Sequence, residues 1–262
     1  MFKGLVKFQA AFSGIEFEAI EISPSYPDIV KATLASAPIP SSPEEGTILL
    51  TVDVTGADTF HDAIRKAEEF ALHVAKLLTF EFGVFHQRFR HVGESLVEEQ
   101  SQPDGSTKTI HHLSDGISIG CIAYSWTKPS IERLIEVKSI LQEKTRFDCL
   151  YYDQFYFSLE LTDPLSKFMA LYSIVLTLCN DRQEEVDRFV LETQPNVPTN
   201  SPYKPRKSGT QETLYTRLRN QVGHVRPETT IEATRSEMQE NLNGLVEITK
   251  KLITDKTQKK RN

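Results

Sequence analysis

The chain has 262 residues, of which 39% are hydrophobic and 25% are charged, and its formal net charge is −6. This length allows one or two domains with a full apolar core, and the composition excludes a mainly disordered chain and a collagen-like one. The strongest apolar stretch, residues 168–179, is shorter than the ~18 residues that a membrane span needs. The N-terminus lacks the pattern of a secretory signal peptide, so we expect a cytoplasmic protein with no membrane segment.

The first part of the chain mixes strand and helix patterns. Strands are predicted at three places, residues 4–12, 15–22 and 47–54. The Pro-, Ser- and Ala-rich stretch 32–46 is typical of a loop. Apolar residues that recur at steps of three and four predict a helix over residues 58–78.

The pattern changes again before the middle of the chain. Residues 94–112 predict two strands joined by a turn at residues 103–105, and residues 117–126 (ISIGCIAYSW) predict a buried strand. A helix is predicted over residues 129–143, and the mixed part of the chain ends there. No internal repeat is apparent.

The rest of the chain is predominantly helical. Residues 150–161 alternate enough to form a strand, but a helix is preferred because they carry an apolar stripe and a helical region follows. Asp163 can cap the next helix, and Pro164 suits its first position. A clean apolar stripe predicts that this helix is buried on one side. A further helix is predicted over residues 184–191.

Four prolines predict a loop over residues 194–209. A helix is predicted over residues 210–224, ended by Gly223 and by a proline four residues later. Thr229 and Glu232 form a capping-box pattern that predicts the start of one long final helix.

These patterns divide the chain near residue 145 and predict an α+β protein. Residues 1–145 form a mixed α/β domain of unknown role, and residues 146–262 form an all-α bundle of about four long helices with a basic tail.

Two basic zones stand out from the acidic average. Residues 201–226 contain six basic residues against one acid, Glu212, and residues 248–262 contain six against Asp255, so each zone has a formal charge of +5. Such zones can mark where a polyanion binds, although a solvated surface or a frayed tail gives the same pattern.

The first basic zone gathers residues suited to phosphodiester chemistry. Residues 214–226 read LYTRLRNQVGHVR and place Arg219, Asn220 and His224 near the end of an amphipathic helix. A guanidinium binds phosphate oxygens through a planar, permanently charged fork. A histidine exchanges a proton near neutral pH, and an asparagine can orient either partner. With the 2′-hydroxyl of RNA as the nucleophile, this set needs no metal.

This grouping resembles the HEPN family, whose signature is an arginine, four to six residues and a histidine, with a polar residue, often asparagine, after the arginine. Here the gap is four residues and Asn220 follows Arg219. The apolar and aromatic stretch 162–180 also looks like a helix of the larger HEPN-type proteins, including those associated with methylamine-utilisation operons. The resemblance covers about residues 150–257.

The resemblance implies a HEPN-like bundle and a metal-independent endoribonuclease that leaves a 2′,3′-cyclic phosphate and a 5′-hydroxyl, of a toxin or anti-phage defence kind. Arg219 would hold the scissile phosphate, His224 would act as general acid or base, and Asn220 would orient them. It also implies a homodimer whose site takes one copy of the motif from each subunit. A regulatory protein partner would fit such an effector.

Other cations are expected to contact the RNA. Arg217 is an alternative to Arg219, because it also satisfies the family spacing to His224. In a helix with ~100° per residue, Arg217 shares a face with His224, whereas Arg219 points about 140° away from it. Gly223 can end the helix and re-aim the histidine, so both arginines remain open. The remaining expected RNA contacts are Arg226 and, in the Pro-rich loop, Lys204, Arg206 and Lys207.

A structural interpretation competes with the catalytic one. In it, Arg219 forms a salt bridge, Asn220 bonds to a loop and His224 helps to end the helix. The protein would then be a non-catalytic HEPN-like RNA-binding or dimerising scaffold. The three cysteines are far apart without metal-ligand spacing, which predicts free thiols; neither a metal nor a cofactor is expected.

Overall fold

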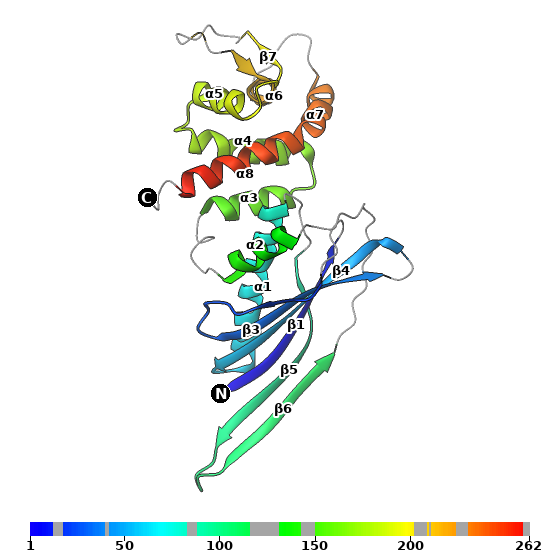
Figure 1. Ribbon diagram of the computed structural model, residues 1–262, viewed down its shortest axis with the longest axis vertical. Coiled ribbons are helices and arrows are strands. Elements are labelled where there is room, and N and C mark those ends of the chain that lie inside the picture. Colours follow the sequence, from blue (N-terminus) through cyan, green and yellow to red (C-terminus); the bar gives the residue numbers. More distant parts are fainter. Residues whose placement is uncertain are drawn as a thin grey trace. The chain divides into compact units, whose positions relative to one another are not determined.

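A computed structural model describes residues 1–12, 18–39, 42–82, 88–115, 131–142, 150–201, 209, 211–223 and 230–258. These residues form two compact units, one up to residue 142 and the other from residue 150 onward (Figure 1). The first unit combines an antiparallel sheet with helices and the second is mainly helical, so the chain is of mixed α+β type. The strand predicted over residues 117–126 lies outside the described residues.

The sheet of the first unit has six strands in the order β2-β3-β4-β1-β5-β6, and each neighbouring pair is antiparallel. The strands are β1 (Phe2–Phe12), β2 (Ile20–Ile22), β3 (Ile29–Ile39), β4 (Ser42–Ala57), β5 (Arg90–Ser101) and β6 (Thr107–Asp115). The turn predicted at residues 103–105 is confirmed between β5 and β6.

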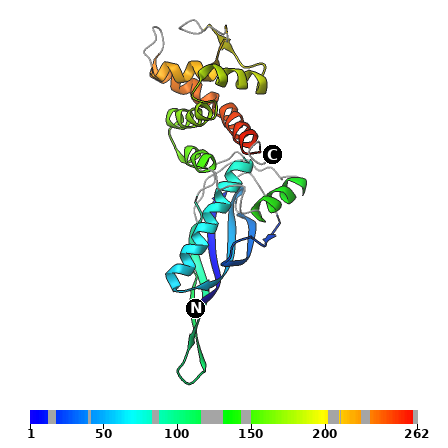
Figure 2. The same cartoon turned by 90° about the vertical axis from the view of Figure 1, so that its left-hand side faces the viewer.

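One face of the sheet forms the core of this unit. Val6 and Phe8 on β1 lie opposite Val52 and Leu50 on β4, and all four are buried. Helix α1 (Phe60–Phe82) lies along this face and packs on β1 and β4 (Figure 2). Helix α2 (Ile131–Gln142) packs against α1 and β2. The alternation of buried and outward residues follows from the two-residue period of a strand.

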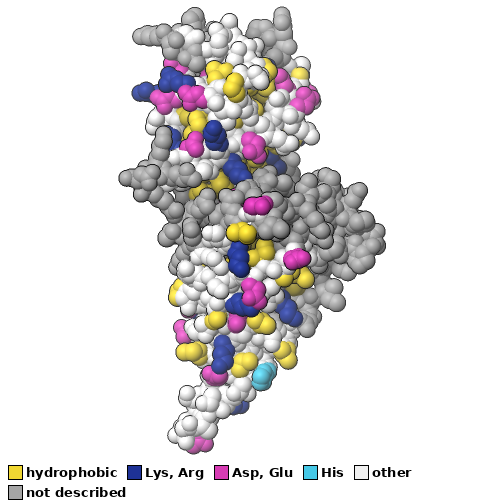
Figure 3. Space-filling model, viewed as in Figure 1, with side chains coloured by type: hydrophobic (Ala, Val, Ile, Leu, Met, Phe, Trp, Pro, Cys, Tyr) yellow, Lys and Arg dark blue, Asp and Glu magenta, His cyan; other side chains and the backbone are white. Residues whose placement is uncertain are grey.

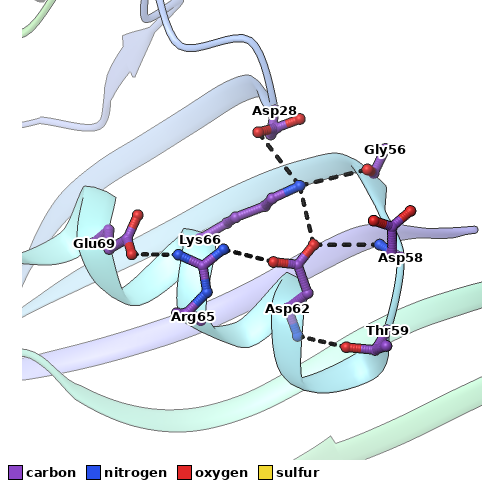
Figure 4. A network of polar contacts seen from close by, with 8 residues as sticks. All are labelled: Asp28, Gly56, Asp58, Thr59, Asp62, Arg65, Lys66 and Glu69. Carbon is purple, nitrogen blue, oxygen red and sulfur yellow. Dashed lines mark hydrogen bonds and ion pairs between the residues drawn. The ribbon is translucent and has the colours of Figure 1, made fainter.

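A polar network fixes the start of α1 (Figure 4). The hydroxyl of Thr59 accepts the backbone N–H of Asp62 at 3.0 Å, which caps the helix. Arg65 and Lys66 bind the Asp62 carboxylate at 2.7 and 3.1 Å. Their hydrogen bonds lower the pKa of Asp62 to about 2. Lys66 also reaches Asp28 at 3.4 Å, so the network ties α1 to the segment before β3.

Charged side chains of both signs lie on the surface of the first unit. Lys3 pairs with Glu99 and Lys31 with Glu21, each at 2.6 Å. The space-filling view shows basic and acidic groups interspersed over the visible face of this unit (Figure 3). These described residues therefore do not offer a polyanion a uniformly basic surface.

The prediction of a loop over residues 32–46 is wrong, because the described residues of this stretch belong to the end of β3 and the start of β4. Its small residues alternate like those of a strand: Ala32 and Leu34 are buried, whereas Thr33 is half-exposed. Pairing with β4 overrides the weak strand preference of alanine and serine. Pro38 is tolerated because β2 pairs only with residues 32–34 of β3, which leaves the other edge at Pro38 without a described strand partner.

The second unit is built around one helix. Its helices are α3 (Leu150–Glu160), α4 (Pro164–Leu178), α5 (Gln183–Thr193), α6 (Leu214–Gly223), α7 (Ile231–Glu240) and α8 (Leu242–Gln258). Helix α4 is apolar on nearly every side and contacts all of the others (Figure 1). The predicted cap is confirmed, since the carboxylate of Asp163 accepts the backbone N–H of Ser166 at 2.8 Å. The helix preferred over residues 150–161 is also confirmed.

Three boundaries differ from the sequence prediction. The final helix is two helices, because Asn241 ends α7 and turns its side-chain amide back onto the carbonyl of Glu237 at 2.8 Å. The cap of α7 is Thr230, one residue after the predicted Thr229, and its hydroxyl accepts the N–H of Ala233. Helix α6 begins four residues later than predicted, after a two-residue strand, β8 (Glu212–Thr213), which pairs with β7 (Thr199–Asn200).

No helix among those described combines the length and the apolar character that crossing a membrane requires.

Candidate functional site

The candidate site lies on α6 of the second unit. Leu214, Tyr215 and Leu218 of this helix are buried in the second unit. Arg219 and Asn220 follow in the next turn, and α6 ends at Gly223. The predicted helix is therefore confirmed over residues 214–223, and the motif begins within the last two described turns of a packed helix.

A buried carboxylate anchors the start of α6. Asp187 on α5 accepts the backbone N–H of Thr213 at 2.9 Å, the hydroxyl of Thr213 at 2.5 Å and the hydroxyl of Thr216 at 2.6 Å. All three residues are completely buried. These bonds explain why residues 212–213 are extended: Asp187 engages the first polar groups before the helix begins.

Asn220 is bonded on both ends of its side-chain amide, and 8% of its surface is exposed. Its side-chain nitrogen donates to the carboxylate of Glu212 at 2.7 Å. Its side-chain oxygen accepts from the amide nitrogen of Gln183 at 2.9 Å and from the Nη1 of Arg219 at 3.0 Å. The asparagine thus connects β8, the start of α5 and the neighbouring arginine in one cluster.

The two candidate arginines have different partners. Arg217 forms an ion pair with Glu237 on α7, and 18% of the Arg217 side chain is exposed. Arg219 is half-exposed, and no carboxylate of the described residues lies within ion-pair distance of it. A guanidinium has five N–H donors. Arg219 gives one of these to Asn220, which leaves donors for an incoming anion.

A surface pocket of about 430 Å³ opens beside this cluster. It is lined by the first residues of α5 and by the residue before them, namely Arg182, Gln183, Glu184, Glu185 and Arg188. Gln183 therefore faces the pocket and also bonds to Asn220. Neither Arg219 nor Asn220 lines this pocket, so Gln183 is the link between the pocket and the motif.

Five of the residues singled out in the sequence lie outside the described residues: His224, Arg226, Lys204, Arg206 and Lys207. In the structure, Arg219 donates a hydrogen bond to Asn220, whereas Arg217 forms an ion pair with Glu237. Of the three cysteines, Cys179 is described; it is a buried free thiol, and burial raises its pKa to about 11. Such a thiol is protonated and unreactive at neutral pH.

Sequence reasoning missed three residues around the motif: Glu212 and Gln183, which bond to Asn220, and Asp187, which anchors the start of α6. Glu212 is 1% exposed although it stands in a basic stretch of the chain. The signal that could have marked Glu212 is that it is the single acid in a stretch with six basic residues. A carboxylate is buried only where hydrogen-bond or ion-pair partners compensate for the lost water. Gln183 and Asp187 carry no such signal, since acids and amides are common near the start of a helix. Within the described part of the chain, no group of three or more His, Cys, Asp or Glu residues is placed to hold a metal ion.

Comparison with known proteins identifies no match: no family model, no curated protein and no solved structure is similar to this chain.

Proposed function

We propose that the protein is a metal-independent endoribonuclease of HEPN type, in which Arg219 binds the scissile phosphate of RNA. The observation that carries the proposal is the state of this arginine: it is half-exposed, held by Asn220 and without a carboxylate partner among the described residues. A guanidinium held in this way is prepared for a phosphate group, because its own orientation need not change on binding. Arg217 is a poorer candidate because Glu237 already binds it.

In the proposed reaction, His224 takes the proton of the 2′-hydroxyl or gives one to the 5′-oxygen that leaves. The 2′-oxygen attacks the neighbouring phosphorus, the bond to the 5′-oxygen breaks, and a 2′,3′-cyclic phosphate and a 5′-hydroxyl result. Arg219 stabilises the charge that gathers on the phosphate oxygens. His224 follows α6 directly in the sequence. A second copy of the motif, from a partner subunit, would complete the site.

The test is RNA cleavage by the purified protein in EDTA, with structured and with single-stranded RNA. We expect the wild-type protein to cleave and His224→Ala to lose activity by about 10²-fold or more, the usual contribution of a general acid or base. His111→Ala is the matched control, because His111 is an exposed histidine of the first unit. Equal cleavage by all three proteins, or cleavage that EDTA abolishes, would contradict the proposal.

A second candidate function is a non-catalytic RNA-binding or dimerising scaffold. The burial of Asn220 against Glu212 favours it, since this bond is what a purely structural motif would show. The scaffold predicts that Arg219→Ala changes RNA affinity or oligomeric state while the RNA stays intact. Size-exclusion chromatography with light scattering, combined with RNA gels, distinguishes the two functions.

A further inference from the structure

Glu212 is a buried carboxylate whose role the sequence motif does not explain. It belongs to the short strand β8, eight residues before Asn220, and is 1% exposed. Burial of a carboxylate is unfavourable unless hydrogen bonds compensate for the lost water. One of these bonds comes from the side-chain nitrogen of Asn220 at 2.7 Å.

The neighbours of Asn220 specify which way its amide points. Glu212, as a carboxylate, can only accept a hydrogen bond, and Arg219 can only donate one. The two therefore require the same arrangement, with the nitrogen of Asn220 toward Glu212 and the oxygen toward Arg219. Gln183 fits this arrangement as well, because its own amide nitrogen donates to the same oxygen at 2.9 Å.

We propose that Glu212 is a positioning residue, which acts through Asn220 to hold the guanidinium of Arg219 in the orientation that receives a phosphate group. The inference rests on the proposed function for the identity of the phosphate, which belongs to RNA. Without the carboxylate at position 212, Arg219 and Gln183 alone among the described residues hold the amide of Asn220 in this orientation. In the turned form the nitrogen of Asn220 meets the nitrogen of Arg219, two donors face each other, and the guanidinium loses its support.

The test exchanges the two partners. Glu212→Gln replaces one acceptor oxygen by a donor, so residue 212 no longer excludes the turned amide of Asn220. Asn220→Asp sets two acceptors against each other. The double variant E212Q/N220D restores one donor and one acceptor in reversed order and again leaves an oxygen for Arg219. Glu237→Gln is the matched control, because it also changes a carboxyl to an amide beside α6 but removes the partner of Arg217.

Two properties of each variant are measured. The first is the order of the Arg219 side chain from ¹⁵N relaxation of its Nε–H group, which needs no RNA. The second is the affinity for a 2′-O-methyl RNA, which cannot undergo attack by a 2′-hydroxyl. We expect each single variant to reduce the order and to weaken binding by about tenfold, the effect of one charge-assisted hydrogen bond. The double variant should restore the order of Arg219 but not RNA binding, because the carboxylate introduced at position 220 gives Arg219 a partner that competes with phosphate. E212Q/R219A should bind RNA as R219A does, since the effect passes through Arg219.

The outcomes separate this inference from the proposed function. If Glu212→Gln leaves the order of Arg219 unchanged, or weakens RNA binding equally with and without Arg219, the positioning role is wrong, whatever the RNA assays show. If the order changes and recovers as expected but the wild-type protein neither binds nor cleaves RNA, the positioning role stands and the proposed function is rejected.

Discussion

The hydroxyl of Thr216 donates to the carboxylate of Asp187 at 2.6 Å, and this bond joins α6 to α5 inside the second unit. The hydroxyl of Tyr172 on α4 lies 2.9 Å from the same oxygen of Thr216. Because the proton of Thr216 points toward Asp187, the tyrosine is the donor to Thr216. This buried chain of polar groups connects three helices and fixes the position of the helix that carries Arg219.

Asp187→Ala should destabilise the second unit strongly. Three donors would lose their acceptor, so we expect the free energy of unfolding to fall by about 3 kcal/mol or more. Asp187→Asn keeps one side-chain oxygen and should cost about half as much. Urea unfolding followed by circular dichroism measures both. The control is Asp181→Asn, an exposed acid next to α5, which should change stability by less than about 0.5 kcal/mol. Equal stability of Asp187→Ala and the control would contradict this account.

Arg219→Ala and Arg217→Ala should differ in their effects on RNA cleavage and on stability. Arg219→Ala removes the proposed phosphate ligand, so RNA cleavage should fall by about 10²-fold or more with little change in stability. Arg217→Ala breaks a partly exposed ion pair with Glu237, which should cost at most about 1 kcal/mol of stability and leave cleavage within a few-fold. Single-turnover cleavage rates and thermal midpoints test the pair. A larger loss of activity in Arg217→Ala would assign the phosphate to Arg217 instead.

The sequence predicted those elements whose signal is local. Asp163 and Pro164 marked the start of α4, because capping depends on adjacent residues. The strand character of residues 32–46 was missed because it comes from pairing within the sheet, where β3 pairs with β4 and β4 pairs with β1, which is distant in the sequence. Likewise, the break at Asn241 depends on one side-chain bond to Glu237, which hydrophobic spacing does not reveal.

The same distinction applies to the candidate site. The adjacency of Arg219 and Asn220 is a property of the sequence, and so was the ambiguity between the two arginines. The partners that separate those arginines, Glu237 for one and Asn220 for the other, come from three-dimensional packing. Helical spacing gives the direction of a side chain from its own helix but not the charge that it meets on the next one.

The stability of the first unit should depend on Asp62 in acid. Its pKa is lowered to about 2 by the hydrogen bonds from Arg65 and Lys66, whereas an unfolded chain has the ordinary value near 3.9. A lowered pKa means that the contribution of Asp62 is complete above about pH 4 and is lost as the pH falls through about 2. Asp62→Asn should therefore lower the thermal midpoint at pH 6, and the difference from wild type should shrink toward pH 2.

Side-chain ¹³C NMR of Asp62 would check the pKa directly, and thermal melts of both proteins across this pH range would check the stability. Asp104→Asn is a suitable control, because that carboxylate lies in the β5–β6 turn, and its bonds to Ser106 lower its pKa without a cationic partner. A midpoint difference for Asp62→Asn that stays constant down to pH 2 would exclude the ionisation of Asp62 as its cause.

Gly244→Ala should destabilise the protein although the residue lies inside a helix. Alanine normally stabilises a helix relative to glycine by about 1 kcal/mol. Here a methyl group on Gly244 would collide with the hydroxyl of Tyr215, which is buried and donates to Gln194 at 2.8 Å. We expect a net loss of about 1–3 kcal/mol in the free energy of unfolding, the usual cost of overpacking.

Tyr215→Phe removes the colliding oxygen, so adding Gly244→Ala to this variant should cost much less than adding it to the wild type. Urea unfolding of the four proteins measures this coupling, and equal costs in both backgrounds would show that Gly244 does not accommodate the Tyr215 hydroxyl.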